Sequence, residues 1–439
     1  MNNRRLLTWL LAAIMSGGGV HAQDTCRRVV SIEEIFDSAE ANSAQLRPFL
    51  RAEEEARKGI EVAKSDRLPD INASLRLSFI GNGFTTRRDF SDFQKAPIPH
   101  FGEDLGINVS QPLFTGGALT GAVELAELKS TALRHASDRQ RDNIRFRLVG
   151  MYLDIYKCNN LRGVVEKSIS RAEKVVEEMK ARYAQGVALR NDITRYELML
   201  FNLKLQLVRI DNTLDILNRN LVTIAGLPQN LRVVPDSALL HRALPSADEA
   251  WWQSEASGNS PRLKIVGSEA AISSKAEKIV KSERYPKVNL QAGWSLNGPI
   301  LTEIPPINRN LSYWYVGVGV SYNLSSLYKT NKSLARSRQA SLLAAERLES
   351  ERENVSLDVN TDYVRYREAY EDLKTREKSV ELAVRNYNTI ATRYTAGTAL
   401  ITDLLDAADS RLDAETGLVN SRIDIIYYYY KLLFTSGKI

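Results

Sequence analysis

The sequence predicts a mixed α and β membrane protein, in which each chain gives four strands to a trimeric 12-stranded β-barrel that continues into a long α-helical coiled-coil barrel. Three observations predict this fold: an internal duplication, two pairs of alternating strands, and two very long segments without proline. We divide the chain into a signal peptide over residues 1–22, a first repeat over 23–240 and a second repeat over 241–439.

The duplication is visible as one motif that occurs twice at a constant offset. Residues 182–192, Arg-Tyr-Ala-Gln-Gly-Val-Ala-Leu-Arg-Asn-Asp, return at 393–403 as Arg-Tyr-Thr-Ala-Gly-Thr-Ala-Leu-Ile-Thr-Asp. The offset is 211, because 393 − 182 and 403 − 192 give the same value, and it also pairs 105–110 with 316–321. Such a chain is interpreted as one structural unit used twice.

The N-terminus has the features of a secretory signal peptide. Arg4 and Arg5 precede a short apolar run, and small residues end the segment at Ala22. The run is too short to span a bilayer, so we expect the chain to leave the cytoplasm. Without the two arginines, 59 − 2 = 57 bases face 53 acids. Because these charges alternate along the chain, a nucleic-acid partner is disfavoured.

Two cysteines remain in the mature chain, Cys26 and Cys158. In an oxidising compartment they could form a disulfide that ties the N-terminus to a helix. The alternative is two free thiols, because nothing in the sequence fixes their separation.

Each repeat begins with a helical segment and continues into strands. The helices are expected at about 43–66 and 261–283, and Pro69 and Pro286 follow them, as residues that cannot continue a helix. Apolar and polar residues then alternate, which predicts a β-hairpin at 69–114 and another at 286–324. Strands of about 10 residues, when tilted, cross an outer membrane.

Aromatic residues near the strand ends fit the girdles of a membrane barrel, although a soluble β-layer with ordinary core aromatics would show the same alternation. They are Phe79, Phe84, Phe101, Phe114, Trp294, Tyr313, Trp314, Tyr315 and Tyr322.

The segments after the strands predict two long helical hairpins, at 118–225 and 329–434. At ~1.5 Å per residue, a helix of about 65 residues is on the order of 100 Å long, which is typical of a coiled coil. Apolar residues spaced by three and four form the expected packing seam. In the first repeat they are Ile169, Ala172, Val176, Met179 and Tyr183, and in the second Val380, Ala383, Tyr387, Ile390 and Tyr394.

Each long helix is expected to turn at a glycine, Gly186 or Gly397, and to return as a second helix. Asp192 and Asp403 stand where N-cap residues of the returning helices would lie. Between the repeats, residues 226–260 are rich in proline and serine and are interpreted as a mixed linker region.

The number of strands demands partner chains. Four strands cannot close a transmembrane barrel, and an open sheet in lipid would leave edge amides unsatisfied. Three copies give twelve strands, so closure predicts a homotrimer with a hollow helical extension.

The duplicated Arg-Tyr-x-x-Gly-x-Ala-Leu segment with its following Asp, and Asp403-Leu404-Leu405-Asp406, resemble the TolC family of outer-membrane channels over essentially the whole mature sequence. The resemblance implies a passive duct from periplasm to exterior, with the barrel in outer-membrane lipid, the helices in the periplasm and no cofactor. It further implies a periplasmic membrane-fusion adaptor, with Gly186 and Gly397 at the docking tips, and an inner-membrane transporter of the RND, ABC or MFS type. Efflux of drugs or metal ions and type I protein secretion both remain open.

The resemblance also implies a closed aperture at the helical tips. By position, Asp403 and Asp406 resemble the family's aspartate rings, and Tyr394 resembles its tip tyrosine. Three copies of two carboxylates would place six negative charges around the pore, which attract cations and repel anions. The alternative is that both are first-turn residues favoured by the helix dipole.

The tip of the first hairpin carries the other expected aperture residues, Asn191 and Asp192. The family example has an arginine where this chain has Ala399, so the family's salt-bridge lock is not expected here. Arg190, two residues before Asp192, is the hypothetical substitute.

Two other functional classes are weighed against a channel. An enzyme is disfavoured, because the four histidines are scattered and no metal-ligand spacing, nucleophile elbow or phosphate loop is present. A periplasmic coiled-coil scaffold or adaptor is the stronger alternative, although it would not need a duplicated unit of strands and helices.

Overall fold

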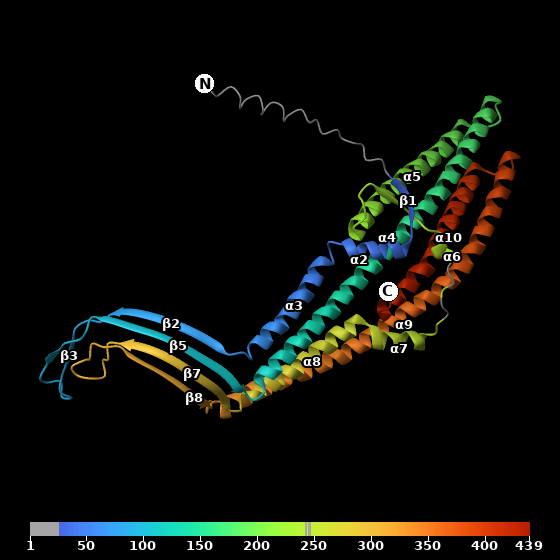
Figure 1. Cartoon of the computed structure of the whole chain (residues 1–439). Helices are drawn as coiled ribbons and strands as arrows, with labels where there is room; N and C mark the ends of the chain where they lie inside the picture. The colour runs from blue at the N-terminus through green and yellow to red at the C-terminus, as the bar shows by residue number, and fades with distance from the viewer. Residues whose placement is uncertain (1–25, 242–243, 245–246) are drawn as a thin grey trace, which may run out of the picture.

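The computed structural model describes residues 26–241, 244 and 247–439, so the expected signal peptide lies outside the described residues. The chain is elongated, with a curved β-sheet at one end and a long body of helices at the other (Figure 1). Along residues 26–241, 244 and 247–439, none of the helices combines the length and apolar character needed to cross a bilayer.

The sheet consists of four antiparallel strands in the order β2-β5-β7-β8. The hairpin predicted at 69–114 corresponds to β2 (Asp70–Phe79) and β5 (Phe101–Phe114), and the one at 286–324 to β7 (Lys287–Gly298) and β8 (Leu311–Ser321). β5 pairs with β7, so the two hairpins form one sheet whose edges are β2 and β8.

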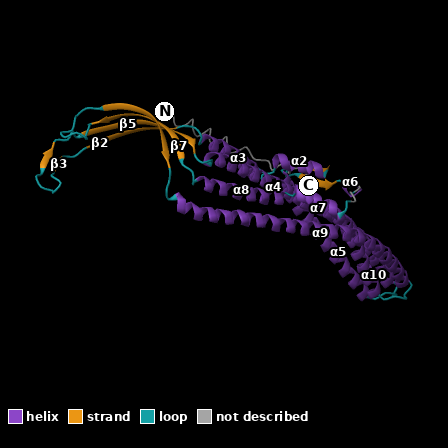
Figure 2. Cartoon of the chain, turned by 90° about the horizontal axis from the view of Figure 1, so that it is seen from below, coloured by secondary structure: helices purple, strands orange, loops and turns teal. Residues whose placement is uncertain are grey.

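The strand register gathers the apolar side chains on one face. Ile71 pairs with Val109, which pairs with Ala292, which pairs with Val316, and the alternation repeats this pattern along the sheet. In the part of the chain that the structure describes, no helix covers this face, and Ile71 and Trp314 are 65% and 75% exposed (Figure 2).

Three of the expected girdle aromatics do not lie on this apolar face at a strand end. Tyr313 and Tyr315 pair with Ser295 and Gly293, so the register places them on the polar face. Phe84 lies in a separate small hairpin, β3 (Gly83–Thr85) with β4 (Gln94–Ala96), which was not predicted. The alternation itself places Tyr313 and Tyr315 opposite Trp314, whereas the position of Phe84 could not be expected, because alternation does not say where a strand ends.

The two long helical hairpins are α4 (Ala118–Ala184) with α5 (Arg190–Ala225), and α9 (Ser326–Thr395) with α10 (Ile401–Ser436). α4 packs against both α5 and α10, and α10 packs against α9, so α5 and α9 lie at the two outer edges. Next to the sheet, α3 (Arg47–Ser65) packs on α4, while α8 (Pro261–Ser282) packs on α4 and α9. These two helices correspond to the segments predicted before the strands.

The predicted seam forms much of the core near the helical tips. Ala172, Val176, Met179 and Tyr387 are buried there, while Ile169, Ile390 and Tyr394 pack at its edge. Tyr183 was wrongly placed in the seam, because its side chain is exposed near the end of α4.

The middle of the molecule contains elements that the sequence did not predict. β1 (Cys26–Val30) pairs in parallel with β6 (Leu231–Pro235), and α2 (Ile32–Asn42) follows β1. The expected linker region at 226–260 therefore contains β6, α6 (Ala238–His241) and α7 (Glu249–Asn259). It forms part of the folded middle section and is not a simple connection.

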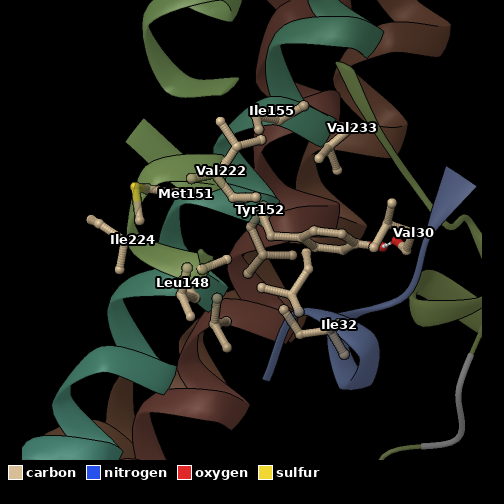
Figure 3. Close-up of a cluster of buried hydrophobic side chains, with 14 of the residues drawn as sticks. Val30, Ile32, Leu148, Met151, Tyr152, Ile155, Val222, Ile224 and Val233 are labelled. Atoms are coloured by element: carbon tan, nitrogen blue, oxygen red, sulfur yellow. Dashed lines mark hydrogen bonds between the residues drawn. The ribbon is translucent and has the colours of Figure 1, made fainter. Parts of the chain in front are cut away.

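Tyr152 of α4 attaches this small sheet to the helical body. Its buried hydroxyl donates to the Val30 carbonyl over 2.9 Å (Figure 3). The same hydroxyl accepts from the Asp236 amide over 2.6 Å. Cys26 and Cys158 are both free in the structure, which is the second of the two alternatives left open by the sequence. Strand pairing and the Tyr152 hydrogen bond hold the N-terminal segment without that crosslink.

Candidate functional site at the helical tips

The two hairpin turns have the same backbone geometry 211 residues apart. Gly186 and Gly397 have φ angles of +77° and +74°, in the left-handed region that favours glycine at a helix end. The Val187 amide donates to the Arg182 carbonyl over 3.0 Å, and the equivalent Thr398 amide donates to that of Arg393 over 2.8 Å. Each long helix therefore ends in a glycine-dependent reversal, as predicted.

The structure corrects the predicted capping role of the two aspartates. The N-cap residues are Leu189 and Leu400, and Asp192 and Asp403 stand at the third helical position. The Asp403 carboxylate accepts from the Leu400 amide over 3.0 Å, which is one half of a capping box. A leucine side chain has no acceptor, so the reciprocal half does not form.

At the tips, the two hairpins approach each other near Arg182, Asp192 and Tyr394, of which Arg182 was not among the predicted aperture residues. The Arg182 guanidinium of α4 donates to the Thr395 carbonyl of the other hairpin. Burial raises the pKa of Tyr394, and the nearby Asp192 carboxylate acts in the same direction. Tyr394 and Asp192 therefore lie near one another on the two hairpins.

An acidic face runs along the start of α10, opposite the buried Ile401, Leu404 and Ala407. Its exposed carboxylates are Asp403, Asp406, Asp409 and Asp413. Although Asp409 is exposed, partial desolvation raises the pKa of its carboxyl group, and the neighbouring Asp413 and Asp406 carboxylates raise it further. Asp409 and Asp413 were not among the predicted aperture residues, although they follow Asp406 by three and seven residues and so lie on the same helical face.

The remaining predicted residues form no lock within one chain. Arg190 and Asn191 are exposed at the first turn of α5, and among the described residues no ion pair involves Arg190. Ala399 is half-buried in the second turn and has no charged group to offer. The inter-hairpin contact comes instead from Arg182, whose position in the duplicated Arg-Tyr motif was the available clue.

The outer edge of the helical body carries an uncovered apolar stripe. On α5 it consists of Leu198, Phe201, Leu205 and Val208, which are spaced by three and four and are 49–66% exposed. On α9, at the opposite edge, Leu357 and Val364 are exposed seven residues apart. Such spacing is typical of a helix that packs against another helix.

The sequence model of the family described as outer membrane efflux protein matches residues 35–227 and 252–425. The outer membrane efflux protein BepC of Brucella suis biovar 1 is 21% identical over 384 residues, covering 87% of this chain and 79% of BepC. The outer-membrane channel OprN superposes with a TM-score of 0.77 at 16% identity, over 93% of this chain and 90% of OprN. The outer membrane protein VceC of Vibrio cholerae superposes with a TM-score of 0.76 at 16% identity, over 92% of this chain and 96% of VceC.

Proposed function

This chain belongs to the outer membrane efflux protein family, and on that premise we propose that three copies form a passive duct from the periplasm to the exterior. The observation that carries the proposal is the four-stranded sheet with one uncovered apolar face and two free edges, β2 and β8. Pairing β8 of one copy with β2 of the next satisfies both edges and closes twelve strands. The apolar face then contacts outer-membrane lipid, and the polar face lines the lumen.

The helical body supports the same assembly. α5 and α9 lie at opposite edges of each protomer, so a ring brings α5 of one copy against α9 of the next. The stripe from Leu198 to Val208 would be buried in that contact, at about 25 cal/mol per Å² of apolar surface removed from water. Because each of the three copies has two helical hairpins, the ring would contain six pseudo-equivalent hairpins.

The tips would form the narrow periplasmic end of this duct. Three copies of the α10 acidic face give a ring of carboxylates that attracts cations and excludes anions. The Arg182 hydrogen bond to the Thr395 carbonyl would hold the two hairpins of each copy together and keep the aperture narrow.

We propose that the duct works in a tripartite assembly with a periplasmic adaptor and an inner-membrane transporter. The turns at Gly186 and Gly397 are exposed with Val187 and Leu400 beside them, which gives the adaptor an apolar surface on each tip. The cargo, whether drug, metal ion or secreted protein, would be selected by the transporter.

The deciding experiment combines light scattering with single-channel conductance of the detergent-purified mature protein in planar bilayers. A trimer with small, cation-selective openings is expected. Replacing Asp403 and Asp406 by Ala should weaken the cation preference, whereas Glu55→Ala, which removes an exposed carboxylate of α3, should not. A monomer without conductance would contradict the duct and favour the periplasmic scaffold.

A further inference from the structure

The small hairpin β3–β4 has no role in the duct described so far. It lies in the loop between β2 and β5, at the end of the sheet farthest from the helices (Figure 1). In the proposed assembly this end is the outer rim of the barrel. We call residues 83–96 the rim flap.

One face of the rim flap is aromatic and free. Phe84 pairs with Lys95, and Phe93 lies two residues before Lys95, so the three side chains share a face. The two phenylalanine rings are 5.4 Å apart, and their residues are 67% and 65% exposed. The other face packs back on the loop, because Ala96 is buried and a Cβ at Gly83 would lie 2.5 Å from the Ile98 side chain.

The tip of the rim flap presents a third phenylalanine. Phe90 is 79% exposed and has a φ of +61°, a conformation that costs free energy for a bulky residue. The Ser91 carbonyl accepts from the Arg87 amide over 2.9 Å, and the Asp89 carboxylate accepts from the Ser91 amide and hydroxyl over 3.1 and 2.7 Å. The turn is thus held by its own hydrogen bonds with the ring pointing outward.

Two cations, Arg88 and Lys95, accompany the aromatic rings. Arg87 forms an ion pair with Asp92 over 3.5 Å. Within residues 26–241, 244 and 247–439, no ion pair or side-chain hydrogen bond is made by the charged ends of Arg88 and Lys95. A surface that combines exposed phenylalanine with unpaired cations matches a membrane interface, where rings enter the acyl boundary and cations meet phosphates.

We propose that the rim flap lies on the outer leaflet and binds its anionic, phosphate-bearing lipid headgroups. The apolar band of the sheet leads directly to it, because Phe79 and Phe101, the paired residues at the outer ends of β2 and β5, are both strongly exposed. Phe84, Phe90 and Phe93 extend this band beyond the strands, and Arg88 and Lys95 bind the phosphates. The inference rests on the proposed barrel, which alone places the flap at the level of the outer leaflet.

The test uses full-length mature protein in phosphatidylcholine vesicles with and without phosphatidylglycerol. Phe90→Trp and, separately, Phe84→Trp supply fluorescent probes, and the spectrum of the parent protein is subtracted. We expect strong quenching by lipids brominated near the headgroup and weak quenching by aqueous acrylamide. Phosphatidylglycerol should strengthen the lipid quenching by about two-fold or more, as expected of headgroup attraction to two cations.

Charge reversal provides the matched control. Arg88→Glu with Lys95→Glu should remove the response to phosphatidylglycerol, while Arg309→Glu, on the loop between β7 and β8, should retain it. Both probes quenched by acrylamide but not by brominated lipid would overturn the proposal and place the flap over the lumen or in solvent. Conductance in the same vesicles distinguishes failure of this proposal from failure of the proposed duct. Channels without lipid quenching would overturn only the lipid-binding role of the rim flap. The absence of channels would overturn the proposed duct as well.

Discussion

In the proposed assembly, Arg182 is the residue whose removal should loosen the tip most directly. Its guanidinium on α4 donates to the Thr395 carbonyl of the second hairpin, and its side chain is 28% exposed. A hydrogen bond from a charged group contributes roughly 1.5–3 kcal/mol, which we reduce to about 1 kcal/mol for partial solvent exposure. If three copies open together, the closed duct of Arg182→Ala loses about 3 kcal/mol of stabilisation relative to the open duct. Because every 1.4 kcal/mol changes an equilibrium constant about tenfold, the ratio of open to closed duct should rise on the order of 100-fold.

Single-channel recording measures this ratio as the fraction of time spent at high conductance. Lys180→Ala is the matched control, because Lys180 lies two residues earlier and its ion pair with Glu197, at 2.7 Å, stays within the first hairpin. Arg182→Lys should give an intermediate value, since it keeps the charge but not the planar guanidinium. If Lys180→Ala opens the duct as much as Arg182→Ala, the effect is a general loosening of the tip and the inter-hairpin contact is not the lock.

Three further substitutions test other parts of the molecule. Burial raises the pKa of Asp142 to about 6, so the folded state is destabilised as pH rises from about 4 through 6. At pH 8, Asp142→Asn should therefore increase the free energy of unfolding by about 1–2 kcal/mol, after allowance for solvent, and raise the melting temperature. At pH 4 it should have little effect on either quantity. Tyr152→Phe leaves the buried Val30 carbonyl and the half-buried Asp236 amide without this partner, which costs about 1–3 kcal/mol and should speed hydrogen exchange of the β1 and β6 amides about tenfold or more. A Cβ at Gly293 would lie 2.5 Å from the Tyr315 ring, so Gly293→Ala should swing the ring off the polar face of the sheet and lower single-channel conductance, whereas Gly317→Ala, with open space around it, should not.

The long helices were predictable because nothing in their sequences competes with a helix. α4 and α9 contain no proline, their seams repeat with spacings of three and four, and the tip glycines mark where each helix ends. The strands were predictable for a similar reason, since alternation over about ten residues has a single period. Both patterns are local, and each repeat shows them independently.

The missed elements depend on contacts between distant segments. β1 and β6 are five residues each and become strands by pairing with each other about 200 residues apart, which no local period reveals. The interpretation of Asp192 and Asp403 as N-caps was wrong because each helix begins about one turn earlier than expected, after Leu189 and Leu400. The sequence pattern is compatible with either starting point. The duplicated motif marks the position of Arg182 but not its role, because its partner is a backbone carbonyl, which carries no sequence pattern of its own.

The two returning helices show how one unit can serve two purposes. α5 and α10 have the same length, 36 residues each, and their starts differ by the offset of 211. Yet Leu198 of α5 corresponds to Asp409 of α10, and Arg195 corresponds to Asp406. Asn202 likewise corresponds to Asp413, so three of the four aspartates of the acidic face are replaced in α5 by a basic, an apolar and a polar residue, and only Asp192 is kept. The apolar stripe of α5 gains stability by packing against a neighbouring chain, whereas a row of aspartates stays hydrated, so in the proposed assembly α5 suits the subunit interface and α10 the lumen.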